Sequence, residues 1–261
     1  MDYSKISYRV DDGVAVIAFN DPATMNAAGL DVAEQLSHAF KRVAAGEDGV
    51  RAAILTGEGR GFSSGANLSS QGSSDGPRDA GTSLEQVYNP LVTMIKDLPV
   101  PLVTAVNGAA AGVGCSFALM GDIIVAGESA YFLQAFRRIG LVPDGGSTYM
   151  LPRLIGRARA MEMMLLGERI PAAKALEWGL INRCVPDGEL MPTAMTLAKE
   201  LANGPKSLGM IRRLVWASLD AEWPEQLSRE AKVQSEAGRT EDFREGVIAF
   251  LQKRPAAFTG R

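Results

Sequence analysis

The sequence predicts an α/β fold, with a strand-rich core followed by a helical C-terminal region. Short apolar, strand-like runs alternate with amphipathic helical runs through the first three-quarters of the 261-residue chain. Two of these strands lead directly into glycine-rich loops, over 59–68 and 107–114. The last quarter has almost only helical patterns. We therefore predict a core over 1–196 and a helical region over 197–261.

The elements follow one another in a regular order. The chain begins with a predicted hairpin, because Asp11-Asp12-Gly13 separates two β-rich runs, 6–10 and 14–19. Further strands are expected at 51–56, 102–106, 122–126, 131–132 and 181–185. Helices are expected at 30–45, 84–96, 112–120, 144–154, 158–166, 172–178, 191–202, 208–219, 224–237 and 242–251.

Composition excludes several classes of protein. A net charge of −3 leaves no basic excess to neutralise phosphates, so no nucleic-acid partner is expected. The two cysteines, Cys115 and Cys184, have no metal-ligand spacing and form no disulfide scaffold, so no metal site is expected. The chain contains no run of ~18–20 apolar residues and its first residues do not resemble an export signal. We expect a cytoplasmic protein without a membrane partner.

The two glycine-rich loops suggest a chemistry. Small residues leave backbone N–H groups accessible, and two such loops brought together can aim two donors at one oxygen, as in an oxyanion hole. The segment 61–65 also matches the Gly-x-Ser-x-Gly pattern around a nucleophilic serine. That mechanism needs a histidine later in the chain. The only histidine, His38, comes before the serine, so a serine hydrolase is disfavoured.

Asp144 is the most interesting carboxylate, within Gly140-Leu141-Val142-Pro143-Asp144-Gly145-Gly146. One interpretation makes it the N-cap of the following helix. In the other, it is a base in an apolar, glycine-lined site, where burial raises its pKa. The two interpretations are compatible.

Taken together, the two loops resemble those of the crotonase (enoyl-CoA hydratase/isomerase) superfamily. The first family pattern, Gly-x-x-Phe-Ser/Cys-x-Gly-x-Asp-Leu, is met over 59–68 except at Asn67, and the second, Asn-Gly-x-Ala-x-Gly-x-Gly, over 107–114. The resemblance extends over nearly the whole chain. It implies a spiral of ββα turns, a homotrimer or dimer of trimers, and an acyl-CoA substrate with no cofactor beyond its own coenzyme A.

The resemblance also assigns residues. The backbone N–H groups of Ala66 and Val113 would hold the thioester oxygen, and Asp144 would be the catalytic acid/base. The substrate and its coenzyme A arm would contact Met25, Ala27, Ser64, Gly65, Asn67, Leu68, Gly112 and Phe136.

The sequence departs from the hydratases of this family at both catalytic glutamates, where Ser116 and Phe136 stand. Asp144 falls where isomerase members keep an aspartate, and the chain looks most like the 1,2-epoxyphenylacetyl-CoA isomerase group. The resemblance thus implies an acyl-CoA isomerase that shifts a double bond or opens an epoxide, in phenylacetate or fatty-acid degradation. A hydratase and a non-catalytic CoA-binding protein stay open as alternatives.

Overall fold

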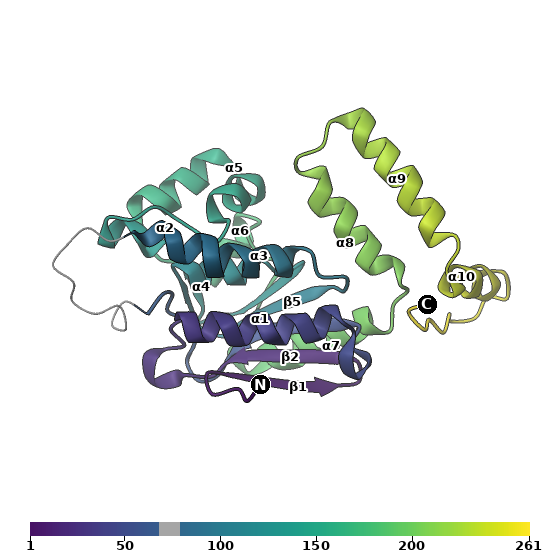
Figure 1. The fold of residues 1–261 in the computed structure, drawn as a ribbon, viewed down its shortest axis with the longest axis horizontal. Helices are drawn as coiled ribbons and strands as arrows, with labels where there is room; N and C mark the ends of the chain where they lie inside the picture. The colour runs from purple at the N-terminus through teal and green to yellow at the C-terminus, as the bar shows by residue number, and fades with distance from the viewer. Residues whose placement is uncertain (68–78) are drawn as a thin grey trace.

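A six-stranded sheet forms the centre of the molecule. The structure is a computed structural model that describes residues 1–67 and 79–261 (Figure 1). Its strand order is β1-β2-β3-β5-β7-β10, and only β1 and β2 are antiparallel. The β1–β2 pair confirms the predicted hairpin, with Ile6 opposite Phe19 and Asp11 opposite Val14. The strands are β1 (Ile6–Asp11), β2 (Val14–Phe19), β3 (Ala52–Gly57), β5 (Leu102–Val106), β7 (Ile123–Gly127) and β10 (Arg183–Val185).

The inner strands β2, β3, β5 and β7 are buried on both faces of the sheet, and their successive residues alternate between the faces, as expected for strands. In β2, Val14 and Val16 face α7 (Leu190–Ala202), whereas Ile17 belongs to the main core on the opposite face. Helix α1 (Leu30–Ala44) contributes to that main core through one apolar side. The sheet is therefore a rigid platform for the loops at its strand ends.

A second, four-stranded sheet has the order β4-β6-β8-β9. Its strands alternate along the chain with those of the central sheet: β4 follows β3, β6 follows β5 and β8 follows β7. Each return to the central sheet passes through helical segments, so the chain winds in repeated ββα turns, as predicted. The strands are β4 (Gly61–Ser63), β6 (Ala109–Ala111), β8 (Tyr131–Leu133) and β9 (Ile170–Pro171).

Most predicted helices are present, with changed ends. One expectation was wrong: the helix after Asp144 begins at Ser147, and Asp144 does not cap it. Gly145 and Gly146 have φ values of 57° and 83°, which a right-handed helix cannot include. The other helices of the core are α2 (Ala80–Ser83), η4 (Leu84–Tyr88), α3 (Asn89–Lys96), α4 (Val113–Ala118), α5 (Ser147–Leu166, interrupted at Gly156) and α6 (Ala172–Glu177), and the short helical turns are η1 (Pro22–Thr24), η2 (Glu47–Gly49), η5 (Ala135–Ile139) and η6 (Asp187–Glu189).

The C-terminal helices extend away from the sheets (Figure 1). They are α8 (Ser207–Ser218), α9 (Trp223–Ala237) and α10 (Glu241–Leu251). Position 196, the predicted end of the core, lies inside α7, which packs on the central sheet. The division into two regions stays a prediction, and the helices that leave the sheet begin with α8. No helix within the described residues is long and apolar enough to cross a membrane.

Candidate active site

The two glycine-rich loops touch each other at one glycine from each. A Cβ atom on Gly65 would lie 2.7 Å from the carbonyl oxygen of Ala111 and 3.5 Å from Cα of Gly112. A Cβ atom on Gly112 would in turn lie 3.7 Å from Cα of Gly65. Both glycines also have positive φ, 93° and 54°. Only glycine permits this close approach, which brings the two expected donors, Ala66 and Val113, next to the contact.

The peptide groups that carry these two N–H donors are held from their carbonyl sides. Ala28 donates its N–H to the Gly65 oxygen at 2.7 Å, and Cys115 donates to the Gly112 oxygen at 3.0 Å. Neither the Ala66 N–H nor the Val113 N–H has a backbone partner among the hydrogen bonds of the described residues. Fixed, unpaired donors are what an oxyanion hole requires. Their role in binding a substrate oxygen stays a prediction.

The segment expected to contact the coenzyme A arm lies along the first loop. Ser64 donates its N–H to the Met25 oxygen at 2.9 Å. The amide of Asn26 donates to the carbonyl oxygens of Glu58 and Gly61 at 2.9 and 2.7 Å. Met25 and Asn26 both have left-handed backbone conformations, with φ values of 54° and 58°. These bonds place the Met25–Ala27 segment beside Ser64 and Gly65, as the resemblance implied.

Of the last two residues in the predicted CoA-binding stretch, Asn67 and Leu68, the structure describes only Asn67. Asn67 lies next to Gly29, because a Cβ on that glycine would be 3.6 Å from Cβ of Asn67. Leu68, the last residue of the predicted set, lies outside the described residues.

The geometry argues against the nucleophilic-serine mechanism. Ser63 is fully buried and donates its hydroxyl to the Asn26 carbonyl oxygen at 2.7 Å. His38 lies on α1, where its Nδ1 pairs with the Tyr3 hydroxyl at 2.8 Å. Cys115 is fully buried, and burial raises the pKa of its thiol to about 12. Neither Ser63 nor Cys115 is a nucleophile at neutral pH.

Asp144 has the surroundings of a base. The residue is half-buried, its Oδ1 atom is inaccessible to solvent, and no described residue donates a hydrogen bond to that atom. Burial raises the pKa of Asp144 to about 6, from an ordinary value of 3.8. Tyr88 lies within reach of its charge: burial and, next, the charge of Asp144 raise the pKa of this tyrosine to about 12. A carboxylate with a pKa near neutrality can take up and release a proton during turnover.

The backbone of Asp144 is fastened to α4, the helix that follows the second glycine-rich loop. Its carbonyl oxygen lies 2.9 Å from the hydroxyl of Ser116 and 2.9 Å from that of Ser147. The two hydroxyls are 2.6 Å apart, and Gln134 donates to Ser147 at 3.2 Å. A Cβ on Gly145 would be 3.4 Å from Cγ2 of Val113. The loop that carries Asp144 therefore lies directly against Val113, the residue expected to supply the second N–H.

Apolar side chains accompany this arrangement. The ring of Phe136 is almost buried and approaches Gly112, since a Cβ on that glycine would lie 3.9 Å from Cζ of Phe136. Leu141, which donates its N–H to the Phe136 oxygen, is exposed. Phe132 is fully buried within the main core. Of these three residues, Phe136 is the one that borders the second glycine-rich loop, 107–114.

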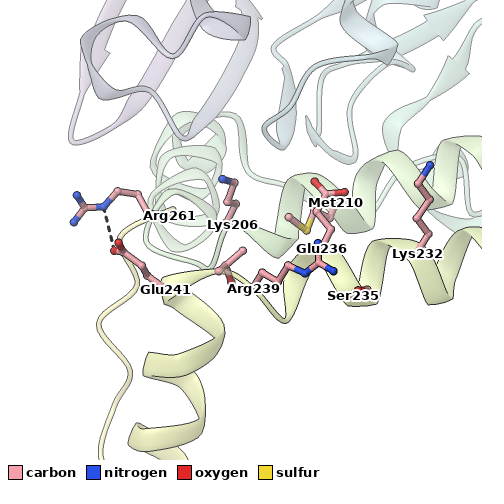
Figure 2. A pocket seen from close by; sticks show the side chains of 9 residues that line it. Lys206, Met210, Lys232, Ser235, Glu236, Arg239, Glu241 and Arg261 are labelled. Atoms are coloured by element: carbon pink, nitrogen blue, oxygen red, sulfur yellow. Dashed lines mark ion pairs between the residues drawn. The ribbon is translucent and has the colours of Figure 1, made fainter.

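A separate cavity of about 720 Å³ lies among the C-terminal helices. Figure 2 shows the side chains that line it. Charged side chains surround it, and two of them, Glu241 and Arg261, are paired at 3.5 Å. The residues that line it are Lys206, Met210, Lys232, Ser235, Glu236, Arg239, Thr240, Glu241 and Arg261. It contains none of the residues predicted to act on a substrate, so it is distinct from the site formed by the two loops.

Comparison with known proteins agrees with this geometry. Residues 9–261 match the enoyl-CoA hydratase/isomerase family. A Rhodobacter capsulatus protein named a probable enoyl-CoA hydratase is 45% identical over the full length of both chains. The 1,2-epoxyphenylacetyl-CoA isomerase of Escherichia coli is 44% identical over 97% of each chain. The crystal structure of an enoyl-CoA hydratase from Bacillus anthracis superposes with a TM-score of 0.91, covering 99% of this chain and 100% of the other at 28% identity.

The chain is a crotonase-fold enzyme. It belongs to the enoyl-CoA hydratase/isomerase family. Two nearly equally similar relatives carry names for different reactions, hydration and isomerisation, so family membership leaves the particular reaction to be argued from the site.

Sequence reasoning missed several residues that shape the site. Ser147, Gln134 and Tyr88 had no predicted role, although all three are buried polar residues close to Asp144 or its peptide. A signal did exist at Ser116, a lone hydroxyl within the apolar run 113–118. A buried polar residue in an apolar helix needs a partner, which here is the Asp144 carbonyl.

Proposed function

We propose that this protein is an acyl-CoA isomerase. Asp144 removes a proton from carbon while the N–H groups of Ala66 and Val113 hold the thioester oxygen. The observation that carries the proposal is the carboxyl group of Asp144, whose Oδ1 is buried without a partner, on a loop fastened next to the two touching glycine-rich loops. One such base is enough to move a proton between two carbons of the same substrate.

The proposed reaction on a 3-enoyl-CoA balances without a co-reactant. Asp144 takes a C2 proton, and the electrons of that C–H bond form an enolate whose negative charge collects on the thioester oxygen. The protonated Asp144 then returns the proton to C4 as the double bond moves to C2–C3. Two N–H donors stabilise the enolate, and loss of one such donor typically costs on the order of 100- to 1000-fold in rate.

The surroundings of Ser116 favour isomerisation over hydration. Hydration uses two acid/base groups, one for water and one for carbon, and the resemblance places the two catalytic glutamates of the hydratases at Ser116 and Phe136. Here the Ser116 hydroxyl donates a hydrogen bond to the Asp144 carbonyl oxygen, and the ring of Phe136 lies beside Gly112 of the second glycine-rich loop. That ring supports a substrate with a bulky apolar or aromatic acyl group, including an epoxide beside the thioester.

A hydratase is the second candidate, because one relative at 45% identity bears that name. In this case Asp144 alone would activate water. We further propose that the enzyme acts in the cytoplasm, in aromatic or fatty-acid degradation, and needs no cofactor beyond the coenzyme A of its substrate. Both cysteines are unpaired, which is consistent with a reducing compartment.

The C-terminal helices support a proposal about assembly. Their surface exposes large apolar side chains, among them Trp223 at 74%, Phe250 at 83% and Leu251 at 74%. Exposed apolar surface of this kind typically marks a contact with another protein. We propose that further copies of this chain cover it, as a homotrimer or a dimer of trimers.

The reaction is tested by supplying a 3-enoyl-CoA and crotonyl-CoA to the purified enzyme and following conjugated enoyl-thioester and 3-hydroxyacyl-CoA by mass-resolved chromatography. We expect isomerisation to exceed hydration, and Asp144→Asn to abolish it. Asp97→Asn, on an exposed surface residue, is the matched control and keeps wild-type activity. Hydration without isomerisation would favour the second candidate, and full activity of Asp144→Asn would refute the assigned base.

A further inference from the structure

Ser116 connects the two halves of the proposed catalytic machinery. It lies on α4, three residues after Val113, which begins the same helix and supplies one proposed oxyanion donor. Its hydroxyl reaches across 28 positions of sequence to the carbonyl oxygen of Asp144, the proposed base, at 2.9 Å. The Ser116 side chain is fully buried, so water does not compete for this bond.

The loop that carries Asp144 has few other contacts to fix it. Residues 140–146 lie in no helix or strand, and Leu141 and Val142 on this loop are exposed. The Asp144 carbonyl oxygen also accepts from the N–H and the hydroxyl of Ser147, but these two donors belong to the turn that follows it. Among the described hydrogen bonds, the one from Ser116 is the bond that ties this oxygen to α4.

Close packing reinforces the same junction. A Cβ on Gly145 would lie 2.7 Å from Cβ of Ser116, so the loop backbone rests against the Ser116 side chain. Two hydroxyl protons are shared among three oxygens, those of Ser116, Ser147 and the Asp144 carbonyl. Either serine can therefore donate to the Asp144 carbonyl oxygen, but only Ser116 bonds it to the helix that begins at Val113.

We propose that Ser116 is a positioning residue, which sets the distance between the base and the oxyanion hole by binding the Asp144 peptide to α4. This inference rests on the proposed function for its kinetic consequence. Ser116 does not touch the reacting atoms in this role. It acts through the backbone of Asp144.

The two serines provide a matched pair of variants. Ser116→Ala removes the bond to α4, whereas Ser147→Ala removes a hydroxyl that contacts the same carbonyl oxygen but leaves α4 connected. Exchange of the α-hydrogens of phenylacetyl-CoA with D₂O, followed by mass spectrometry, reports proton removal directly. We expect Ser116→Ala to lower the exchange rate constant by about 100-fold, the scale of a 1 Å misplacement, with little change in phenylacetyl-CoA affinity. Ser147→Ala should lose no more than about 5-fold, the worth of one hydrogen bond.

A second readout does not depend on activity. ¹³C-NMR titration of labelled aspartate follows the pKa of Asp144, which should fall toward its ordinary value in Ser116→Ala as the loop moves toward water, and stay raised in Ser147→Ala. Ser116→Cys, which keeps the volume but is a weak donor, is the fallback if the alanine variant does not fold. Thr56→Val removes a buried hydroxyl bonded to the Ala105 carbonyl at 2.7 Å, in the central sheet, and should behave as wild type.

The outcomes separate this inference from the proposed function. In one outcome, the wild type shows no exchange while the pKa of Asp144 still falls in Ser116→Ala and stays raised in Ser147→Ala. That result would refute the isomerase proposal and leave the positioning role standing. Exchange that depends on Asp144 but is the same in Ser116→Ala as in wild type, with the same Asp144 titration, would overturn the positioning role alone.

Discussion

At the scale of single residues, the proposed role of Asp144 makes the reaction rate depend on the ionisation of its carboxyl group. Burial alone raises the pKa of its carboxyl to about 6. The proposed base is the charged form of Asp144. The rate of proton removal should therefore be at its maximum at about pH 8 and should decline as the pH falls through about 6. Initial rates of α-hydrogen exchange across this range give the midpoint. A midpoint near the ordinary value of 3.8 would contradict a buried base.

The same burial has a cost in stability. Because the folded-state pKa lies above the unfolded value, the native state loses stability as the pH rises from about 4 to about 6, and does not regain it above that. At about pH 8, Asp144→Asn should therefore unfold at a higher temperature than wild type. Its free energy of unfolding should be larger by at most about 3 kcal/mol, the value for a shift of two pKa units. The difference should disappear below about pH 4. Calorimetry at the two pH values checks this, and a less stable variant at about pH 8 would refute it.

At the scale of elements, Arg212 fastens α8 to the core. Its side chain is buried and pairs with Asp122 at 2.7 Å. It also donates to the carbonyl oxygens of Ile95 and Lys96, in the last turn of α3, and to that of Leu98 just after the helix; the bonds to Ile95 and Leu98 measure 2.8 and 3.0 Å. One guanidinium thereby joins α8, the end of α3 and the turn before β7.

Replacing Arg212 with methionine should cost about 3–5 kcal/mol of unfolding free energy, since Asp122 and the three carbonyl groups lose a buried partner. Its neighbour offers the control. Arg213 is exposed and pairs with Glu236 at the surface, so Arg213→Met should cost no more than about 1 kcal/mol. Urea unfolding of the two variants measures both values, and equal losses would show that Arg212 does not hold the helix.

How far the sequence predicts the elements depends on the range of the interactions that form them. The hairpin, the strands of the central sheet to within one or two residues at their ends, and the two glycine-rich loops follow from local patterns, and the structure has them. The start of α5 was misplaced because Asp144 resembles an N-cap, whereas the positive φ of Gly145 and Gly146 delays the helix. Contacts such as Ser116 with Asp144, or Arg212 with Asp122, join residues 28 and 90 positions apart, and no local spacing indicates them.

At the scale of the whole molecule, the exposed apolar surface of α8–α10 should decide the assembly. In the proposed trimer or hexamer, Phe250 is covered by another copy. Phe250→Ser should then shift the molar mass in solution toward that of one chain at low concentration, because burial of an aromatic side chain contributes about 1.5–3 kcal/mol. Light scattering after size-exclusion chromatography measures this. Arg244→Ser, on the same helix and also exposed, is the polar control and should leave the mass unchanged.

A wild-type protein that elutes with the mass of one chain at all concentrations would refute the proposed assembly. It would leave the family assignment untouched, since that assignment depends on the sequence match over residues 9–261 and not on subunit contacts.

The close approach of Gly145 to Ser116 has a consequence for attempts to redesign the enzyme. The Ser116 side chain is fully buried, and its hydroxyl already contacts the Asp144 carbonyl oxygen at 2.9 Å and the Ser147 hydroxyl at 2.6 Å, so a longer side chain at position 116 must displace these neighbours. A glutamate or aspartate at position 116 would push away the loop 140–146, which carries Asp144. Adding a second carboxylate at position 116 of the proposed one-carboxylate catalyst therefore requires that residues 140–146 be redesigned together with it.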